Sequence, residues 1–134
     1  MPDKSKTDSE ATPRKGPRKD VGFKHFLRSC GYSAKGFRAA WREAAFRQEC
    51  LLGLVTLPLA FWLGHSPLSR FLVCLAWLIV LLTELLNSAV EAVVDLASPG
   101  FHELAGRAKD LASAAVTVSL AIYGASWLYL FITN

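Results

Sequence analysis

Apolar and polar positions divide this chain into a polar first third followed by three long apolar runs. A hydrocarbon core about 30 Å thick needs about 20 apolar helical residues, and the runs predict spanning helices at about residues 50–64, 69–94 and 111–131. Turn-forming Gly, Ser and Pro residues interrupt them at 64–67 and 98–100. The pattern therefore predicts an all-α membrane protein with three transmembrane helices.

A further helix is predicted at residues 23–48, where aromatic and basic residues recur at helical spacing. A basic, aromatic amphipathic helix is typical of a membrane surface. Gly31 is a candidate interruption within it. The first apolar run is short for a membrane, so either this helix continues into it through Ala45 and Phe46, or Pro58 and local thinning accommodate the mismatch.

Composition narrows the class of protein. The net charge of +4 could indicate binding to nucleic acid. The hydrophobic content, 52% of the 134 residues, argues against it. Basic residues beside a membrane meet anionic lipid instead. Residues 1–20 are rich in Pro, Lys and Arg and are expected to form a disordered basic tail, without a secretory signal peptide. Residues 21–134 are expected to form one integral-membrane domain.

The distribution of Lys and Arg predicts the orientation in the membrane. Most of these residues precede the first span, and Arg107 and Lys109 lie between the second and third spans. We therefore expect the N-terminus and the 95–110 segment on the cytoplasmic side. The 64–70 turn and the C-terminus should face outward.

Polar side chains form one stripe along the second span. Positions i, +3, +4, +7 and +11 share a helix face, and they are occupied by Glu84, Asn87, Ser88, Glu91 and Asp95. An ionisable residue at membrane depth costs ~2.5–3.5 kcal/mol on insertion scales, so the stripe indicates a function. The alternatives are hydrogen bonds that hold helices together, chiefly for Asn87 and Ser88, and ion conduction or proton relay.

Further polar groups are expected at the same cytoplasmic level. Glu43 lies near the end of the predicted surface helix, and residues 101–110, predicted as a polar loop or short helix, carry His102, Lys109 and Asp110. Mg²⁺ is held through one or two carboxylates plus substrate phosphates. Lysine binds phosphate as a point charge, and a carboxylate partly withdrawn from water can act as a general base. These groups predict a Mg²⁺–polyphosphate site, built without a GxxxxGK[ST] or GxGxxG segment.

Four segments carry a resemblance to a known family: AAW at 39–41, EAAFRQE at 43–49, ELLNSAVEAVVD at 84–95 and HELAGRAKD at 102–110. Together they resemble the bacterial integral-membrane diacylglycerol kinases of Gram-negative type, over about residues 22–133. The resemblance implies a homotrimer of three-span subunits in the inner membrane, with a cytoplasmic surface helix. It implies transfer of the γ-phosphoryl group of MgATP to diacylglycerol, which yields phosphatidate for phospholipid metabolism and recycles diacylglycerol.

The resemblance also implies roles for individual residues. Glu84 would be the base that takes the proton from the lipid hydroxyl, and Glu43 and Glu91 would hold the divalent metal. The nucleotide-binding residues that it implies are Tyr32, Glu43, Glu91, Phe101, His102, Lys109 and Asp110. The lipid-binding residues that it implies are Cys30, Arg38, Trp41, Glu84, Asn87 and Ser113.

Three departures from the family pattern bear on this site. Only Arg42 separates Trp41 from Glu43, where the family usually has two residues. One deleted residue rotates a helix by ~100°, so a bend would be needed to restore the position of Glu43. His25 replaces an Arg expected to assist the nucleotide, and Gly100 replaces an acidic loop residue.

Two other functions stay open at this point. Kinases that act on a polyprenol such as undecaprenol share the stripe, although segments 43–49 and 102–107 look closer to the diacylglycerol enzymes. A non-enzymatic ion- or proton-conducting oligomer would also use a polar stripe. Such a pore would not obviously need Lys109 and Asp110 beside it.

Overall fold

The computed structural model describes residues 22–133, apart from the side chains of residues 23 and 24. Within this range the chain forms helices and no strand. The helices are α1 (Phe23–Ala40), α2 (Ala44–Leu63), α3 (Pro67–Ala97) and α4 (Glu103–Ile132). The all-α prediction is therefore confirmed, whereas the predicted tail at residues 1–20 lies outside the described residues.

The helices α2, α3 and α4 are long and apolar enough to cross a membrane, which confirms three spanning segments. The 31 residues of α3 extend about 46 Å at a rise of 1.5 Å per residue. A hydrocarbon core is about 30 Å thick. One end of α3 can therefore reach beyond the core while the rest spans it.

The predicted single helix at 23–48 is wrong, because the chain leaves helical geometry at residues 41–43. Helix α1 instead runs through Gly31 without interruption. The first spanning helix accordingly begins at Ala44, six residues before the predicted start, and Pro58 lies inside it. A helix of 20 residues is long enough to span, so the expected mismatch disappears.

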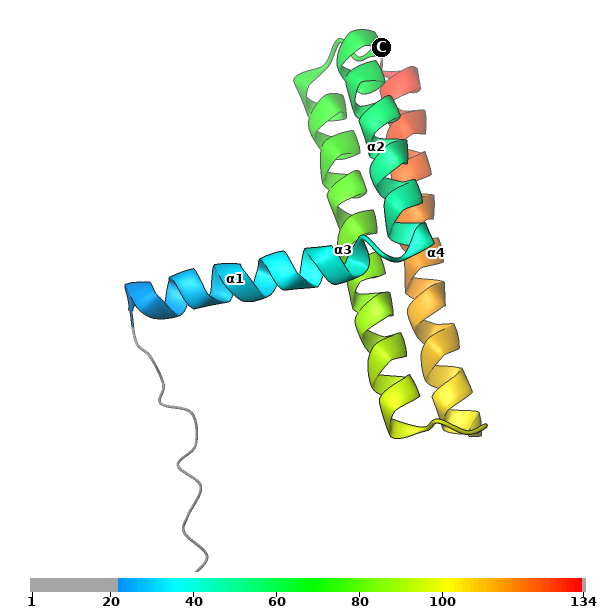
Figure 1. The fold of residues 1–134 in the computed structure, drawn as a ribbon. Coiled ribbons are helices and arrows are strands. Elements are labelled where there is room, and N and C mark those ends of the chain that lie inside the picture. The colour runs from blue at the N-terminus through cyan, green and yellow to red at the C-terminus, as the bar shows by residue number, and fades with distance from the viewer. Residues whose placement is uncertain (1–21, 134) are drawn as a thin grey trace, which may run out of the picture. The chain divides into compact units, whose positions relative to one another are not determined.

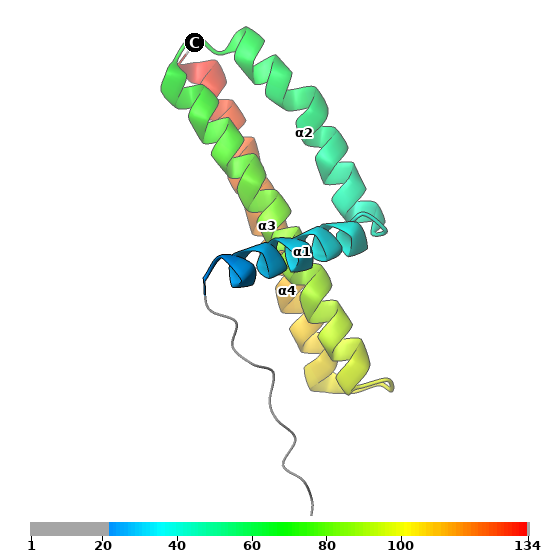
Figure 2. The same cartoon turned by 60° about the vertical axis from the view of Figure 1, so that its left-hand side comes forward.

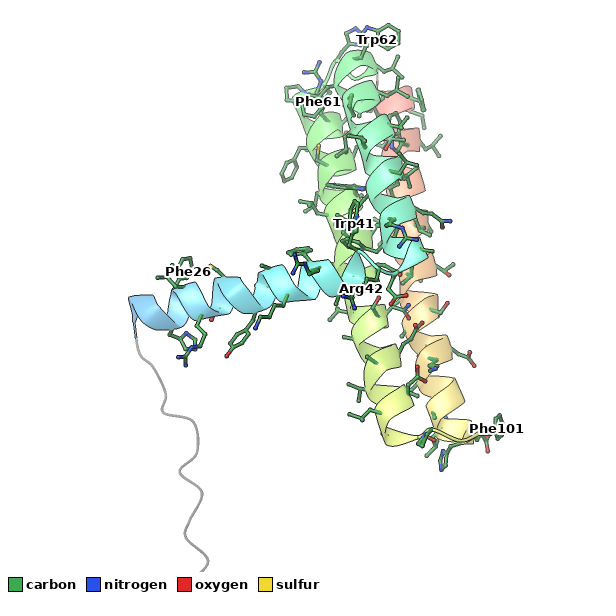
Figure 3. The ribbon with its side chains drawn as sticks, viewed as in Figure 1. Phe26, Trp41, Arg42, Phe61, Trp62 and Phe101 are labelled. Carbon is green, nitrogen blue, oxygen red and sulfur yellow. The ribbon has the colours of Figure 1, made fainter. Side chains whose placement is uncertain are left out.

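Contacts from the first turn of α2 explain the break. The guanidinium of Arg47 donates hydrogen bonds from Nη1 to the carbonyl oxygens of Trp41 (3.0 Å) and Arg42 (2.7 Å). These bonds satisfy carbonyls that the end of a helix leaves without partners. Phe46 is buried and meets the Trp41 ring edge-on. Figure 3 shows Trp41 and Arg42 at this break.

The polar segment at 101–110, expected as a loop or short helix, is mostly part of α4. Its first two turns belong to the same continuous helix as the third span. The Nδ1 atom of His102 accepts a hydrogen bond from the backbone N–H of Leu104 (3.2 Å) and so caps the helix. Glu103 in the first turn also favours helix formation, because a carboxylate is stabilised near the N-terminal end of the helix dipole.

The chain divides into two compact units, 1–34 and 35–134, and the second contains α2, α3 and α4. In this unit α3 and α4 pack as a long antiparallel pair, and α2 lies along one half of it (Figures 1 and 2). The buried hydrophobic cluster consists of Ala60, Val73, Ala76, Val80, Tyr123 and Leu130. It occupies the half that α2 covers, whereas the polar stripe continues into the half that extends beyond α2.

Candidate active site

Glu84 lies in α3 at the wall of a pocket between three helices. Its side chain is only 4% exposed. The pocket is also lined by Gln48 and Glu49 of α2 and by Val116 and Leu120 of α4. A carboxylate buried among apolar residues is costly unless it is paired or functional. Its burial therefore strengthens the functional interpretation of the stripe.

Glu49 is the part of this site that the sequence-based site prediction missed. It is 7% exposed, and its Oε2 atom has no hydrogen-bond partner within the described residues. Glu49 lies close enough to Glu84 for the two like charges to interact. A signal was available, because Glu49 is an ionisable residue in an apolar helix, as Glu84 is.

The structure brings the predicted metal-binding carboxylates toward Glu84. Glu91 follows it by two turns on the same face of α3, and Glu43 directly precedes α2. Both lie within electrostatic range of Glu84. Asn87 donates a hydrogen bond from Nδ2 to Oε1 of Glu91 (3.1 Å), which holds the Glu91 carboxylate in place. Carboxylates from two separate segments thus lie near Glu84, toward the end of α3 that carries Glu91.

The donor set at this end fits a magnesium ion carried with a nucleotide. Glu43 and Glu91 are exposed and offer carboxylate oxygens. The buried Oδ1 atom of Asn87 has no hydrogen-bond partner in the described part of the chain. Across residues 22–133, no group of three or more His, Cys, Asp or Glu residues could hold a metal alone. Mg²⁺ usually takes one or two carboxylates and completes its coordination with water and substrate phosphates.

A second hollow lies at the turn between α3 and α4, at the end of the stripe. Its lining includes Asp95, Gly100, His102 and Lys109. Lys109 forms an ion pair with Asp95, which joins the last turns of α3 to the first turns of α4. Figure 3 shows Phe101 at this turn, where it is fully exposed. The hollow therefore combines a cation, an aromatic surface and a histidine at the margin of the membrane-spanning unit.

Other predicted residues lie exposed on α1, on α4 or in the break between α1 and α2. Asp110 and Ser113 are exposed on the first turns of α4. Arg38 and Trp41 are exposed at the end of α1 and in the break that follows it. Cys30 and Tyr32, with His25, are exposed on the part of α1 that belongs to the first unit. The roles that the resemblance implied for these residues stay predictions.

The fold and the site define a class: a multi-pass helical membrane protein with a carboxylate cluster beside a basic turn. The family described as "Prokaryotic diacylglycerol kinase" matches residues 31–131. The match includes Glu43, Glu84, Glu91 and Lys109. The chain therefore belongs to the prokaryotic diacylglycerol kinase family.

Curated relatives support the same assignment over most of the chain. A diacylglycerol kinase of Pseudomonas aeruginosa is 46% identical over 117 residues, which cover 87% of this chain and 93% of the relative. The diacylglycerol kinase of Escherichia coli (strain K12) is 44% identical over 111 residues, covering 82% and 91%. That of Haemophilus influenzae is 44% identical over 110 residues, covering 81% and 93%. The predicted family and the predicted class of enzyme, a kinase, are thus confirmed.

Proposed function

We propose that this protein is an ATP-dependent lipid kinase that transfers the γ-phosphoryl group of MgATP to the hydroxyl of diacylglycerol, giving phosphatidate and ADP. One observation carries the proposal. On one face of α3, the buried Glu84 lies farther from the α3–α4 turn than the exposed Glu91 does. Seven residues separate them, about 10 Å along the helix axis. This depth difference suits a lipid hydroxyl in the membrane and a nucleotide that arrives from water.

In the proposed reaction Glu84 accepts the proton of the lipid hydroxyl. The hydroxyl oxygen forms a bond to the γ-phosphorus, while the bond from that phosphorus to the bridging oxygen of ADP breaks. Glu49 shares the pocket with Glu84, so a second carboxyl group lies beside the proposed base. General-base catalysis of this kind contributes about 10²–10⁴-fold in rate.

Charge on the transferring group is offset at the outer end of the pocket. Phosphoryl transfer depends mostly on positioning and on neutralising charge. Mg²⁺ held by Glu43 and Glu91 would supply part of that neutralisation. Lys109 would exchange its contact with Asp95 for a phosphate oxygen, since it already lies at the hollow beside the α3–α4 turn. His102 and Phe101 would contact the rest of the nucleotide.

The proposal places the protein in the bacterial inner membrane, with the N-terminus and the α3–α4 turn in the cytoplasm, as a homotrimer. Two features support this setting. Apolar side chains on the spans are largely uncovered within one chain, including Leu54, Leu96 and Ile132, and these surfaces suit lipid or further copies. The basic residues concentrate at the expected cytoplasmic end.

The test is ³²P transfer from ATP to diacylglycerol in mixed micelles by the purified protein. We expect Mg²⁺-dependent formation of phosphatidate. Glu84→Gln keeps the size of the side chain but removes the base, and kcat should fall at least about 10²-fold. Glu103→Gln, a matched change at the exposed start of α4, should leave kcat within about twofold.

Two results would contradict the proposal. The first is an unchanged kcat for Glu84→Gln, which would remove Glu84 as the base. The second is phosphorylation of undecaprenol without phosphorylation of diacylglycerol in a parallel assay, which would change the acceptor.

A further inference from the structure

Trp77 connects α3 to α2 near the candidate active site. Its indole Nε1 donates a hydrogen bond to the backbone oxygen of Glu49 (3.1 Å). Trp77 precedes Glu84 by seven residues, nearly two turns, so both residues lie on the same face of α3. Trp77 forms a hydrogen bond with the backbone of Glu49, and Glu84 shares a pocket with the Glu49 side chain.

Gly53, one turn after Glu49 in α2, makes room for this contact. A Cβ atom at position 53 would lie 2.1 Å from Nε1 and 2.2 Å from Cε2 of Trp77. These distances are far inside van der Waals contact, so any side chain at this position would displace either the indole or α2. Glycine is unfavourable in a helix interior, and the close approach of Trp77 explains its presence here.

Pro58 interrupts the backbone hydrogen bonding of α2 after Gly53. Proline lacks the N–H that continues a helix and clashes with the carbonyl four residues earlier. Pro58 therefore leaves α2 without one backbone hydrogen bond between the half that carries Glu49 and the half that ends at the 64–66 turn. The hydrogen bond from Trp77 to Glu49 joins this half of α2 to α3.

We propose that Trp77 and Gly53 form a helix lock that positions the kinase site, an inference that rests on the proposed function. The lock sets the rotation and height of α2 against α3. It thereby keeps the Glu49 carboxyl group at the pocket that contains Glu84. A shift of α2 by one residue would rotate Glu49 by ~100° and carry it out of this pocket. Trp77 and Gly53 are thus positioning residues that act through Glu49.

Two single variants test the lock. Trp77→Phe keeps an aromatic ring but removes the N–H donor, and Gly53→Ala inserts a methyl group into the space of the indole. Both kcat and KM are measured per folded protein, with the folded fraction taken from size-exclusion chromatography in micelles. We expect kcat on diacylglycerol to fall roughly tenfold or more, with KM for MgATP within about twofold of wild type.

A double variant and two controls separate positioning from general damage. Combining Gly53→Ala with Trp77→Leu shortens the clashing side chain, so kcat should exceed that of Gly53→Ala alone. Gly124→Ala adds the same methyl group where no side chain beyond the adjacent residues and no other helix lies within 4 Å. Trp62→Phe changes a tryptophan that is 80% exposed. Both controls should keep the wild-type kcat.

Wild-type kcat per folded protein in Trp77→Phe and Gly53→Ala would overturn the lock. A loss of folded protein with unchanged kcat would overturn it equally, because it would reveal a structural role alone. An inactive wild-type protein would instead refute the proposed function, and this inference would fall with it.

Discussion

Single residues in the site differ in whether the protein itself satisfies their polar atoms. Oε2 of Glu49 and Oδ1 of Asn87 are buried and have no hydrogen-bond partner among the described residues. Lys109, in contrast, is paired with Asp95. A buried acceptor without a donor is costly. The two unpaired oxygens beside Glu84 therefore mark where a substrate hydroxyl, a water molecule or an ion would complete the site.

Removing the charge of Glu91 should raise the requirement for magnesium. Glu91→Gln keeps the shape of the side chain but weakens its oxygen as a metal ligand. We expect the Mg²⁺ concentration for half-maximal rate to rise at least about tenfold. The measurement is the phosphatidate rate against MgCl₂ concentration at fixed ATP, with Glu103→Gln as the matched control. Superimposable magnesium curves for wild type and Glu91→Gln would exclude Glu91 from the metal site.

Among the elements, the break at residues 41–43 decides where Glu43 lies. Glu43 has extended backbone angles (φ −75°, ψ 134°) immediately before α2. In one continuous helix, the missing residue beside Trp41 would have rotated Glu43 away from the family position. The break uncouples the two helices, so Glu43 follows α2 and its contacts with α3. Glu43 thus lies within electrostatic range of Glu84 although only Arg42 separates it from Trp41.

Removing the hydrogen bonds at this break should weaken MgATP binding more than it lowers the stability of the fold. Arg47→Met removes the bonds to the Trp41 and Arg42 carbonyls. Because Glu43 lies between these residues and α2, we expect KM for MgATP to rise about fivefold or more. The thermal midpoint should change little, because the buried cluster lies in α2, α3 and α4 away from the break.

Arg42→Met is the control for this prediction. It removes an arginine from the same stretch but leaves both acceptor carbonyls in place. Equal increases in KM for Arg42→Met and Arg47→Met would indicate a general effect of positive charge rather than an effect of the two hydrogen bonds.

At the scale of the whole molecule, the two turns that connect the spanning helices allow the orientation in the membrane to be tested. Figure 3 shows Trp62, beside the α2–α3 turn, and Phe101, in the α3–α4 turn, at opposite ends of the unit. The basic residues predict that the Phe101 end is cytoplasmic. A kinase site at that end would have access to cytoplasmic ATP.

Cysteine labelling should reveal this orientation. In a background with Cys30, Cys50 and Cys74 replaced by Ala, His65→Cys should react with a membrane-impermeant maleimide in intact spheroplasts. Phe101→Cys should react only after the membrane is permeabilised, because it faces the interior. Both positions are exposed in the structure. Labelling of Phe101→Cys alone in intact spheroplasts would reverse the proposed topology.

Hydropathy and helical period determined the class of fold and the polar face of α3. Apolar length predicted three spanning helices, and the spacing of Glu84, Asn87 and Glu91 predicted their common face. Both are local properties of a helix, so they can be recognised from the order of residues alone. The ends of the helices were less predictable. The break before Ala44 depends on contacts of Arg47 and Phe46 with the preceding residues.

Only the tertiary structure decided which residues meet across the helices. Glu49 and Glu84 line one pocket, and Trp77 closely approaches Gly53. No spacing in the sequence indicates that these positions of α2 and α3 meet. In a membrane, lipid is as apolar as the helix surfaces, so burial of apolar area does not select a partner. Close packing at a glycine and a few hydrogen bonds select it instead. The sequence by itself therefore determined the helices and the polar face of α3, whereas the packing of the helices determined that Glu49 and Glu84 line one pocket.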